Sequence, residues 1–429
     1  MLVLIALPSL AKAQCLQAPV KDLTAGTVIS VSNVDELQNA VRNAVSGTTI
    51  QILPGQYRLT TTLYVRVPDV VITGDPANCD AVQLIGRGME NSDFGDVRSG
   101  VWIDADGVTV ANLTVRDTYF HTIELNSGPD DIYIYNVRLV NAGTQFIKGN
   151  SNGGFGLGAD RGRVEYTVME YLNGPPMTDR GIGTGYSNGV DVHGGADWQI
   201  RNNLFKNFHT PDHADFLHNP AILMWNGSSN TISENNTFIN VDRAIAYGLV
   251  GRENDHQGGV IKNNFIYMAP GLYSANRTLN SDAPIINWSS PGTKIAHNTV
   301  RTNGNMPKSI EIRFNSQGAE VINNLVDATI LHRDGSAFVS QGNGTIQSGA
   351  FVNESAGDLH LSKTNAARYL TGARLSDVTT DFDGDPRGTS IVYIGADAIA
   401  SEIGLVPVNG VNLMPIMMLL EEDETNIKQ

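Results

Sequence analysis

The sequence predicts an all-β protein, a single parallel β-helix in which each turn of the chain stacks on the turn before it. A short pattern, Ile-x-Asn-Asn-x-aromatic, recurs along most of the 429 residues, and clear copies begin at Ile200, Ile261 and Val321. Successive copies start roughly 25 to 35 residues apart, which is one solenoid turn each. Short alternating strands bounded by Gly, Asn, Asp or Pro fill each period, and no long helical pattern follows residue 46.

The composition restricts the partners of the protein. The formal net charge is −15, and 41% of the residues are hydrophobic, which is enough for a folded core. So acidic a chain repels phosphate backbones and anionic lipids, and no run approaches the roughly 20 apolar residues that cross a bilayer. We expect a monomer with no nucleic-acid partner and no insertion into a membrane.

The first 13 residues have the pattern of a signal peptide. An apolar stretch at residues 2–7 precedes Ala11-Lys12-Ala13, a small-x-small cleavage pattern. Cleavage after Ala13 would deliver the mature chain to the periplasm or the medium. In an exported chain the two cysteines, Cys15 and Cys79, most simply pair, and their disulfide would tie the N-terminus to the body.

Residues 14–46 are expected to form an N-terminal segment that ends in a capping helix. Ser32 or Asn33 can cap this helix, acids occupy its first turn, and Leu37, Val41 and Val45 lie on one face. A solenoid needs its open core covered, and an amphipathic helix can do this.

Residues 47–400 are expected to form the solenoid, followed by a C-terminal tail at 401–429. Each repeated Asn would lie at the same bend of its turn and bond its equivalents above and below, because a tight bend leaves backbone groups unpaired. We interpret these Asn pairs as structural.

Two segments carry a resemblance to a known family. Residues 47–57 read Gly-Thr-Thr-Ile-Gln-Ile-Leu-Pro-Gly-Gln-Tyr, and residues 381–387 read Asp-Phe-Asp-Gly-Asp-Pro-Arg, followed by Tyr393-Ile394-Gly395-Ala396. They resemble the first coil and the closing segment of right-handed parallel β-helix proteins of the pectate-lyase-like superfamily. The resemblance implies a right-handed solenoid over about residues 27 to 400. The resemblance does not indicate a particular activity, because proteins with this fold include lyases, hydrolases, epimerases, adhesins and binding proteins.

Candidate functional residues follow from aligning the strand before each Asn bend. The second residue of each strand is apolar and points inward, so the third and fifth residues point outward. One outward column then contains Glu124, Asp191 and Glu311, and these carboxylates suit sugar hydroxyls or, for Glu124 and Asp191, a Ca²⁺ ion. The next column, expected to bind a polysaccharide through its two Trp faces, contains Asn126, His193, Trp225, Trp288 and Arg313.

Lys148 departs from this alignment, which turns its side chain toward the core. A buried unpaired ammonium is costly, so either the strand shifts its register and brings Lys148 near Glu124 and Asp191, or the amine is paired. A desolvated amine in that place is a candidate base.

The preferred functional hypothesis is an exported lyase that cleaves a uronate-containing, acidic polysaccharide by β-elimination. A cation or Arg313 would neutralise the uronate carboxylate, and His193 or Lys148 would remove the C5 proton. A glycoside hydrolase that uses Glu124, Asp191 and Glu311 is the alternative, and a C5-epimerase or a non-catalytic glycan-binding protein is also compatible with the sequence.

Overall fold

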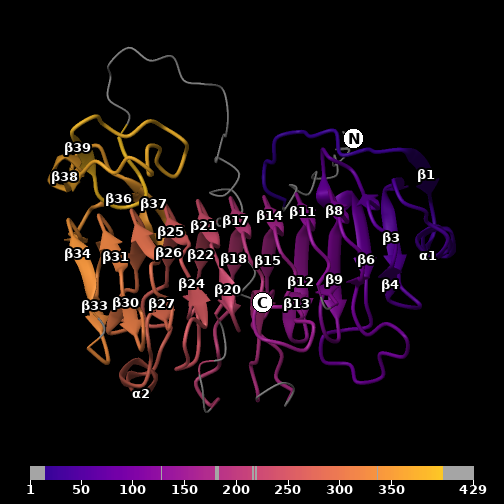
Figure 1. The fold of residues 1–429 in the computed structure, drawn as a ribbon, viewed down its shortest axis with the longest axis horizontal. Helices are drawn as coiled ribbons and strands as arrows, with labels where there is room; N and C mark the ends of the chain where they lie inside the picture. The colour runs from indigo at the N-terminus through magenta and orange to yellow at the C-terminus, as the bar shows by residue number, and fades with distance from the viewer. Residues whose placement is uncertain are drawn as a thin grey trace, which may run out of the picture.

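The structure is a computed structural model, and it describes residues 15–126, 128–178, 183–214, 217, 220–335 and 337–399. Its chain winds as a right-handed parallel β-helix with three long parallel sheets, which we name A, B and C. They run from helix α1 (Val34–Arg42) at one end of the molecule to the last coil at the other (Figure 1). This confirms the predicted fold class.

Each coil gives one strand to each sheet, and each strand pairs in parallel with its equivalent in the next coil. Sheet A contains β1 (Thr27–Val31), β2 (Thr48–Ile52), β5 (Val71–Thr73), β8 (Thr109–Ala111), β11 (Tyr133–Tyr135), β14 (Arg163–Glu165), β17 (Gln199–Arg201), β21 (Ile232–Glu234), β25 (Val260–Lys262), β28 (Lys294–Ala296), β31 (Ala319–Ile322) and β34 (Phe338–Gln341). Sheet B contains β3 (Gly55–Arg58), β6 (Val82–Ile85), β9 (Thr114–Thr118), β12 (Arg138–Ala142), β15 (Val168–Glu170), β18 (Leu204–Lys206), β22 (Thr237–Ile239), β26 (Phe265–Tyr267), β29 (Thr299–Arg301), β32 (Leu325–Val326) and β35 (Gly344–Thr345). Sheet C contains β4 (Leu63–Val65), β7 (Val101–Ile103), β10 (Ile123–Leu125), β13 (Gln145–Gly149), β16 (Asn188–His193), β19 (Ile222–Trp225), β23 (Ile245–Tyr247), β27 (Ile285–Trp288), β30 (Lys308–Arg313) and β33 (Thr329–His332).

Smaller elements lie outside the three sheets. The short strands β20 (Ser228–Ser229) and β24 (His256–Gln257) pair with each other, and helix α2 (Ala275–Leu279) lies on the loop between β26 and β27 (Figure 1). None of the helices among the described residues has the length and apolar character needed to cross a bilayer.

The core fills the space between the three sheets. Aligned aliphatic residues of successive coils, such as Ile123, Ile147, Val190 and Ile222 on sheet C, are fully buried. Stacking like residues in columns keeps the interior close-packed along the solenoid axis.

Helix α1 covers the N-terminal end of this core, as the sequence predicts. Asn33 caps it by accepting from the backbone N–H of Glu36, and Leu37 and Val41 are buried against the first coil. Val45 does not belong to the apolar face of the helix, because α1 ends at Arg42 and the Val45 side chain is exposed.

A ladder of buried asparagines follows the bend between sheets A and B. The Asn203 side-chain amide donates to the Oδ1 of Asn236 at 2.9 Å, and the same bond recurs from Asn236 to Asn264, from Asn264 to Asn298 and from Asn298 to Asn324. The preceding residue has a positive φ in these coils, and Asn tolerates this conformation well. The predicted structural role of the Asn pairs is therefore confirmed.

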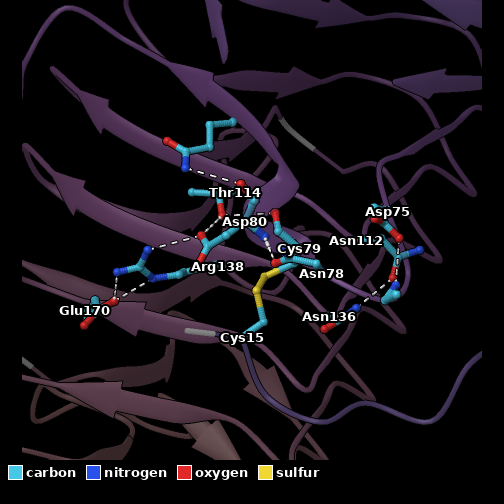
Figure 2. Close-up of a disulfide and its surroundings, with 12 residues drawn as sticks. Cys15, Asp75, Asn78, Cys79, Asp80, Asn112, Thr114, Asn136, Arg138 and Glu170 are labelled. Carbon is cyan, nitrogen blue, oxygen red and sulfur yellow. Dashed lines mark hydrogen bonds and ion pairs between the residues drawn. A yellow bond between two sulfur atoms is a disulfide. The ribbon is translucent and has the colours of Figure 1, made fainter. Parts of the chain in front are cut away.

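The disulfide between Cys15 and Cys79 fastens the N-terminal segment to the body of the solenoid (Figure 2). Asp80, next to Cys79, accepts from Thr114 and forms an ion pair with Arg138, which also forms an ion pair with Glu170 on the next coil. The predicted pairing of the cysteines is confirmed. The predicted signal peptide at residues 1–13 and tail at 401–429 lie outside the described residues.

Residues 346–399, which the sequence analysis counted within the solenoid, fold back along it. The parallel strands end at β35, and two antiparallel hairpins pack over sheet B (Figure 1): β36 (Phe351–Asn353) with β37 (Asp358–Leu361), and β38 (Leu370–Ala373) with β39 (Ile391–Tyr393). The reason is the apolar outer surface of sheet B at this end, where Phe265 and Leu325 pack on Phe382 and Ile394.

Candidate functional site

The outer face of sheet C presents two columns of side chains, as the sequence predicts. In the first column the backbone pairing aligns Tyr64, Trp102, Glu124, Lys148 and Asp191 on five successive coils. In the second column, the backbone pairing aligns His193 with Trp225 on the next coil, and Asn126 lies immediately after β10. Polar side chains from successive coils are therefore held about 4.8 Å apart in rigid strands.

Lys148 points outward and its amine is paired with Asp191, so both possibilities left open by the sequence are found together. Ile147 rather than Phe146 aligns with the inward residues Ile123 and Val190, so Lys148 lies between Glu124 and Asp191 in the first column. A strict alternation of inward and outward residues predicts the wrong direction for Lys148, because the consecutive residues Phe146 and Ile147 are both fully buried.

Lys148, Asp191 and His193 form one hydrogen-bonded cluster on this face. The Nζ of Lys148 lies 2.7 Å from the Oδ2 of Asp191 and 2.7 Å from the Nε2 of His193. The indole N–H of Trp225 donates to the Oδ1 of Asp191 at 3.0 Å, and the His193 and Trp225 rings meet edge to face with centroids 4.5 Å apart. The cluster comes from the adjacent strands β13 and β16, and Trp225 from the next strand, β19, packs against it.

Electrostatics shift the pKa values of two groups in this cluster, Asp191 and His193. The pKa of Asp191 is lowered, because the charges of Lys148 and His193 and the bonds from Lys148 and Trp225 outweigh the opposing effect of burial. The pKa of His193 is lowered below 6.5, mainly by burial and further by the Lys148 and Arg252 cations, against the opposing charge of Asp191. At neutral pH His193 is a neutral imidazole whose Nε2 accepts from Lys148.

Glu124 and Asp191, the predicted metal ligands, are not adjacent to each other. Lys148 lies between them, Glu124 accepts from Ser99 at 2.8 Å, and neither acid belongs to a close group of three His, Cys, Asp or Glu side chains in the described part of the chain. His360, Asp383 and Asp397 do form such a group. In this group His360 contacts both Asp358 and Asp383. These contacts stabilise the folded-back segment, which is a structural role for the group.

The other sequence candidates lie away from this cluster. Arg313 is four strands from His193, about 19 Å, and pairs with Asp334, while Glu311 is fully buried and pairs with Lys308. Trp288 is only 7% exposed, contrary to the exposed position expected from the sequence, because it joins an apolar cluster with Leu223, Ala246 and Ile286, and Phe314 packs against it. Asn126 is partly exposed and donates to Asp104.

Sequence reasoning missed several residues next to the cluster. The Arg252 guanidinium lies 5.7 Å from the Trp225 ring and 5.5 Å from the Phe155 ring, and it pairs with Asp255. Gln145 donates to Asp191 and to the hydroxyl of Tyr186. Arg252, Phe155 and Tyr186 lie in loops, where no strand alternation indicates which residues face the groove.

No protein-family model and no curated protein matches this chain. A search of solved structures found an alginate lyase from Paenibacillus sp. str. FPU-7 at 14% identity, covering 75% of this chain and 99% of that one with a TM-score of 0.37. It also found pectate lyase Pel9A, at 10% identity over 87% of this chain and 86% of that one (TM-score 0.41). An α-1,3-glucanase from Streptomyces thermodiastaticus matches at 13% identity over 78% of this chain and 70% of that one (TM-score 0.44).

The three parallel sheets define the fold as a parallel β-helix, and these likenesses assign the chain to no family. At such low identity the resemblance concerns the fold alone, and the arrangement of the side chains must decide the activity.

Proposed function

We propose that the protein is an exported lyase that cleaves a uronate-containing polysaccharide by β-elimination on the outer face of sheet C. The cluster of Lys148, Asp191 and His193, joined by contacts of 2.7 Å, carries the proposal. It offers a neutral imidazole beside a cation, the pair of groups that proton abstraction next to a carboxylate needs.

The chemistry begins with binding of the uronate carboxylate. Lys148 turns its ammonium from His193 to this carboxylate, which frees the Nε2 lone pair of His193. His193 then takes the C5 proton, whose acidity rises as the cation neutralises the carboxylate. Asp191 keeps the ammonium in place through its 2.7 Å ion pair.

The elimination is completed when the C4–O bond breaks and a double bond forms between C4 and C5. The departing glycosidic oxygen needs a proton, and we assign its donor to Tyr186. Burial and the charge of Asp191 raise the pKa of this tyrosine, so its hydroxyl stays protonated. Arg252 and Trp225 flank the cluster and would contact the neighbouring sugars.

The test is an assay of the mature protein on acidic and neutral polysaccharides. A rise in the ultraviolet absorbance of unsaturated uronate is expected, and His193→Ala should lower turnover by about 10² or more. His332→Ala, which removes an exposed imidazole from the last strand of the same sheet, is the matched control and should leave turnover unchanged. New reducing ends without this absorbance would identify a hydrolase, a changed uronate configuration without cleavage an epimerase, and binding alone a glycan-binding protein.

A further inference from the structure

Two aromatic side chains continue the first column of sheet C beyond the cluster. Tyr64 on β4 is 36% exposed and Trp102 on β7 is partly exposed, and their rings meet edge to face with centroids 5.4 Å apart. Tyr64 lies three strands from Lys148, a distance of about 14 Å along the same face. Rings exposed beside a reactive cluster offer a surface for the apolar faces of sugars.

Two arginines flank these rings without a carboxylate partner. The Arg66 guanidinium lies 4.8 Å from the Tyr64 ring and 5.5 Å from the Trp102 ring, and Arg42 in the last turn of α1 bonds the side chain of Asn39. Neither forms an ion pair with any residue that the structure describes, whereas Arg252 and Arg313 on the same groove are both paired. In a chain of net charge −15, two guanidiniums that line one cavity and have no ion-pair partner among the described residues favour an anionic ligand.

A cavity of about 170 Å³ lies between these arginines, where α1 meets the first coil. Arg42, Arg66 and Tyr64 line it together with Gln38, Thr61 and Thr62 and the aliphatic residues Val41, Leu63 and Val67. Two cations and one aromatic ring around a small cavity match a carboxylate-bearing sugar ring.

We propose that this end of the groove is a distal subsite that binds a uronate of the polysaccharide, with its carboxylate on Arg42 and Arg66 and its ring on Tyr64 and Trp102. The inference rests on the proposed function and deepens it. Because the subsite lies about 14 Å from Lys148, it selects long acidic chains over short ones. The capping helix thereby contributes a binding group as well as covering the core.

The test is calorimetric titration with hexasaccharides of mannuronate and galacturonate, and with cellohexaose as the neutral probe. The titrations use proteins carrying His193→Ala, so that the sugar is not degraded. We expect the Arg42→Ala/Arg66→Ala double variant to bind its preferred oligouronate about tenfold or more weakly, the usual effect of a lost charge-assisted bond. Arg58→Ala is the matched control, because this exposed arginine lies in the same coil but on sheet B. It should bind within about twofold of the parent.

Circular dichroism spectra that match the parent show that the variants are folded. The subsite is overturned if neither oligouronate binds, if the double variant binds as Arg58→Ala does, or if cellohexaose binds equally well and shows the same loss. Arginine-dependent binding by a protein that releases no unsaturated product would support the subsite and reject the lyase. A cleavage rate that is unchanged in the Arg42→Ala/Arg66→Ala variant would support the lyase and reject the subsite.

Discussion

At the level of single residues, the proposed activity depends on the protonation of His193. Its imidazole is held beside a cation and partly removed from water, and both effects favour the neutral form. An ordinary histidine on an exposed strand would be largely protonated in mildly acidic medium. The position of His193 among Lys148, Asp191 and Trp225 therefore extends the pH range in which a base is available.

The pH dependence of turnover follows with a definite sign. Because His193 must be neutral to accept the C5 proton, kcat/KM should rise with pH, with its lower midpoint below pH 6.5, and should reach a plateau near neutrality. Arg252→Gln removes a cation that lowers the pKa of His193, so the midpoint should move upward. Rates measured between pH 4 and 8 check both statements, and a wild-type midpoint above 6.5 would contradict the assignment of His193 as the base.

At the scale of elements, the asparagine ladder fixes how successive coils stack. The amide group of each ladder residue bonds the residue above it and backbone carbonyls of neighbouring coils. Asn264, for example, is fully buried and donates to Asn298 and to the carbonyl of Ser233. Since every member is satisfied, the ladder stabilises the bend between sheets A and B, and loss of one member would leave its neighbours unpaired.

Asn264→Ala should therefore lower the free energy of unfolding by about 2–4 kcal/mol, because it leaves buried donors and acceptors without partners. The measurement is chemical denaturation followed by circular dichroism. Asn276→Ala on the exposed surface of α2 is the control and should change the free energy by no more than about 0.5 kcal/mol. Equal effects of the two substitutions would show that the ladder does not stabilise the fold.

At the scale of the whole molecule, the solenoid is secured differently at its two ends. The N-terminal segment is held by α1 over the core and by the Cys15–Cys79 disulfide, while the C-terminal segment folds back over sheet B. The fold-back segment packs on sheet B rather than on sheet C, and His193 and Trp225 on sheet C remain partly exposed.

Opening the disulfide should destabilise the protein, because the bridge closes a loop with a sequence separation of 64 residues. The chain-entropy relation gives about 4 kcal/mol for a loop of this size. The Cys15→Ser/Cys79→Ser variant should unfold at a lower denaturant concentration than the oxidised wild type, and wild type treated with reductant should match the variant. An unchanged midpoint in the variant would show that α1 and the first coil hold the N-terminus without the bridge.

The solenoid, its capping helix, the Asn bends and the second outward column could be predicted from the sequence, because each depends on a local pattern with a fixed period. The sequence also brought His193 and Trp225 into one column, since strand alternation carries over from coil to coil. The folded structure was needed to establish the direction of Lys148, the burial of Trp288 and Glu311, and the approach of Arg252 and Tyr186 to the cluster. These depend on packing at a single coil and on loops that cross the face of sheet C, and neither leaves a periodic signal along the chain. For the same reason the fold-back of residues 346–399 could not be foreseen: contact with distant Phe265 and Leu325 fixes it.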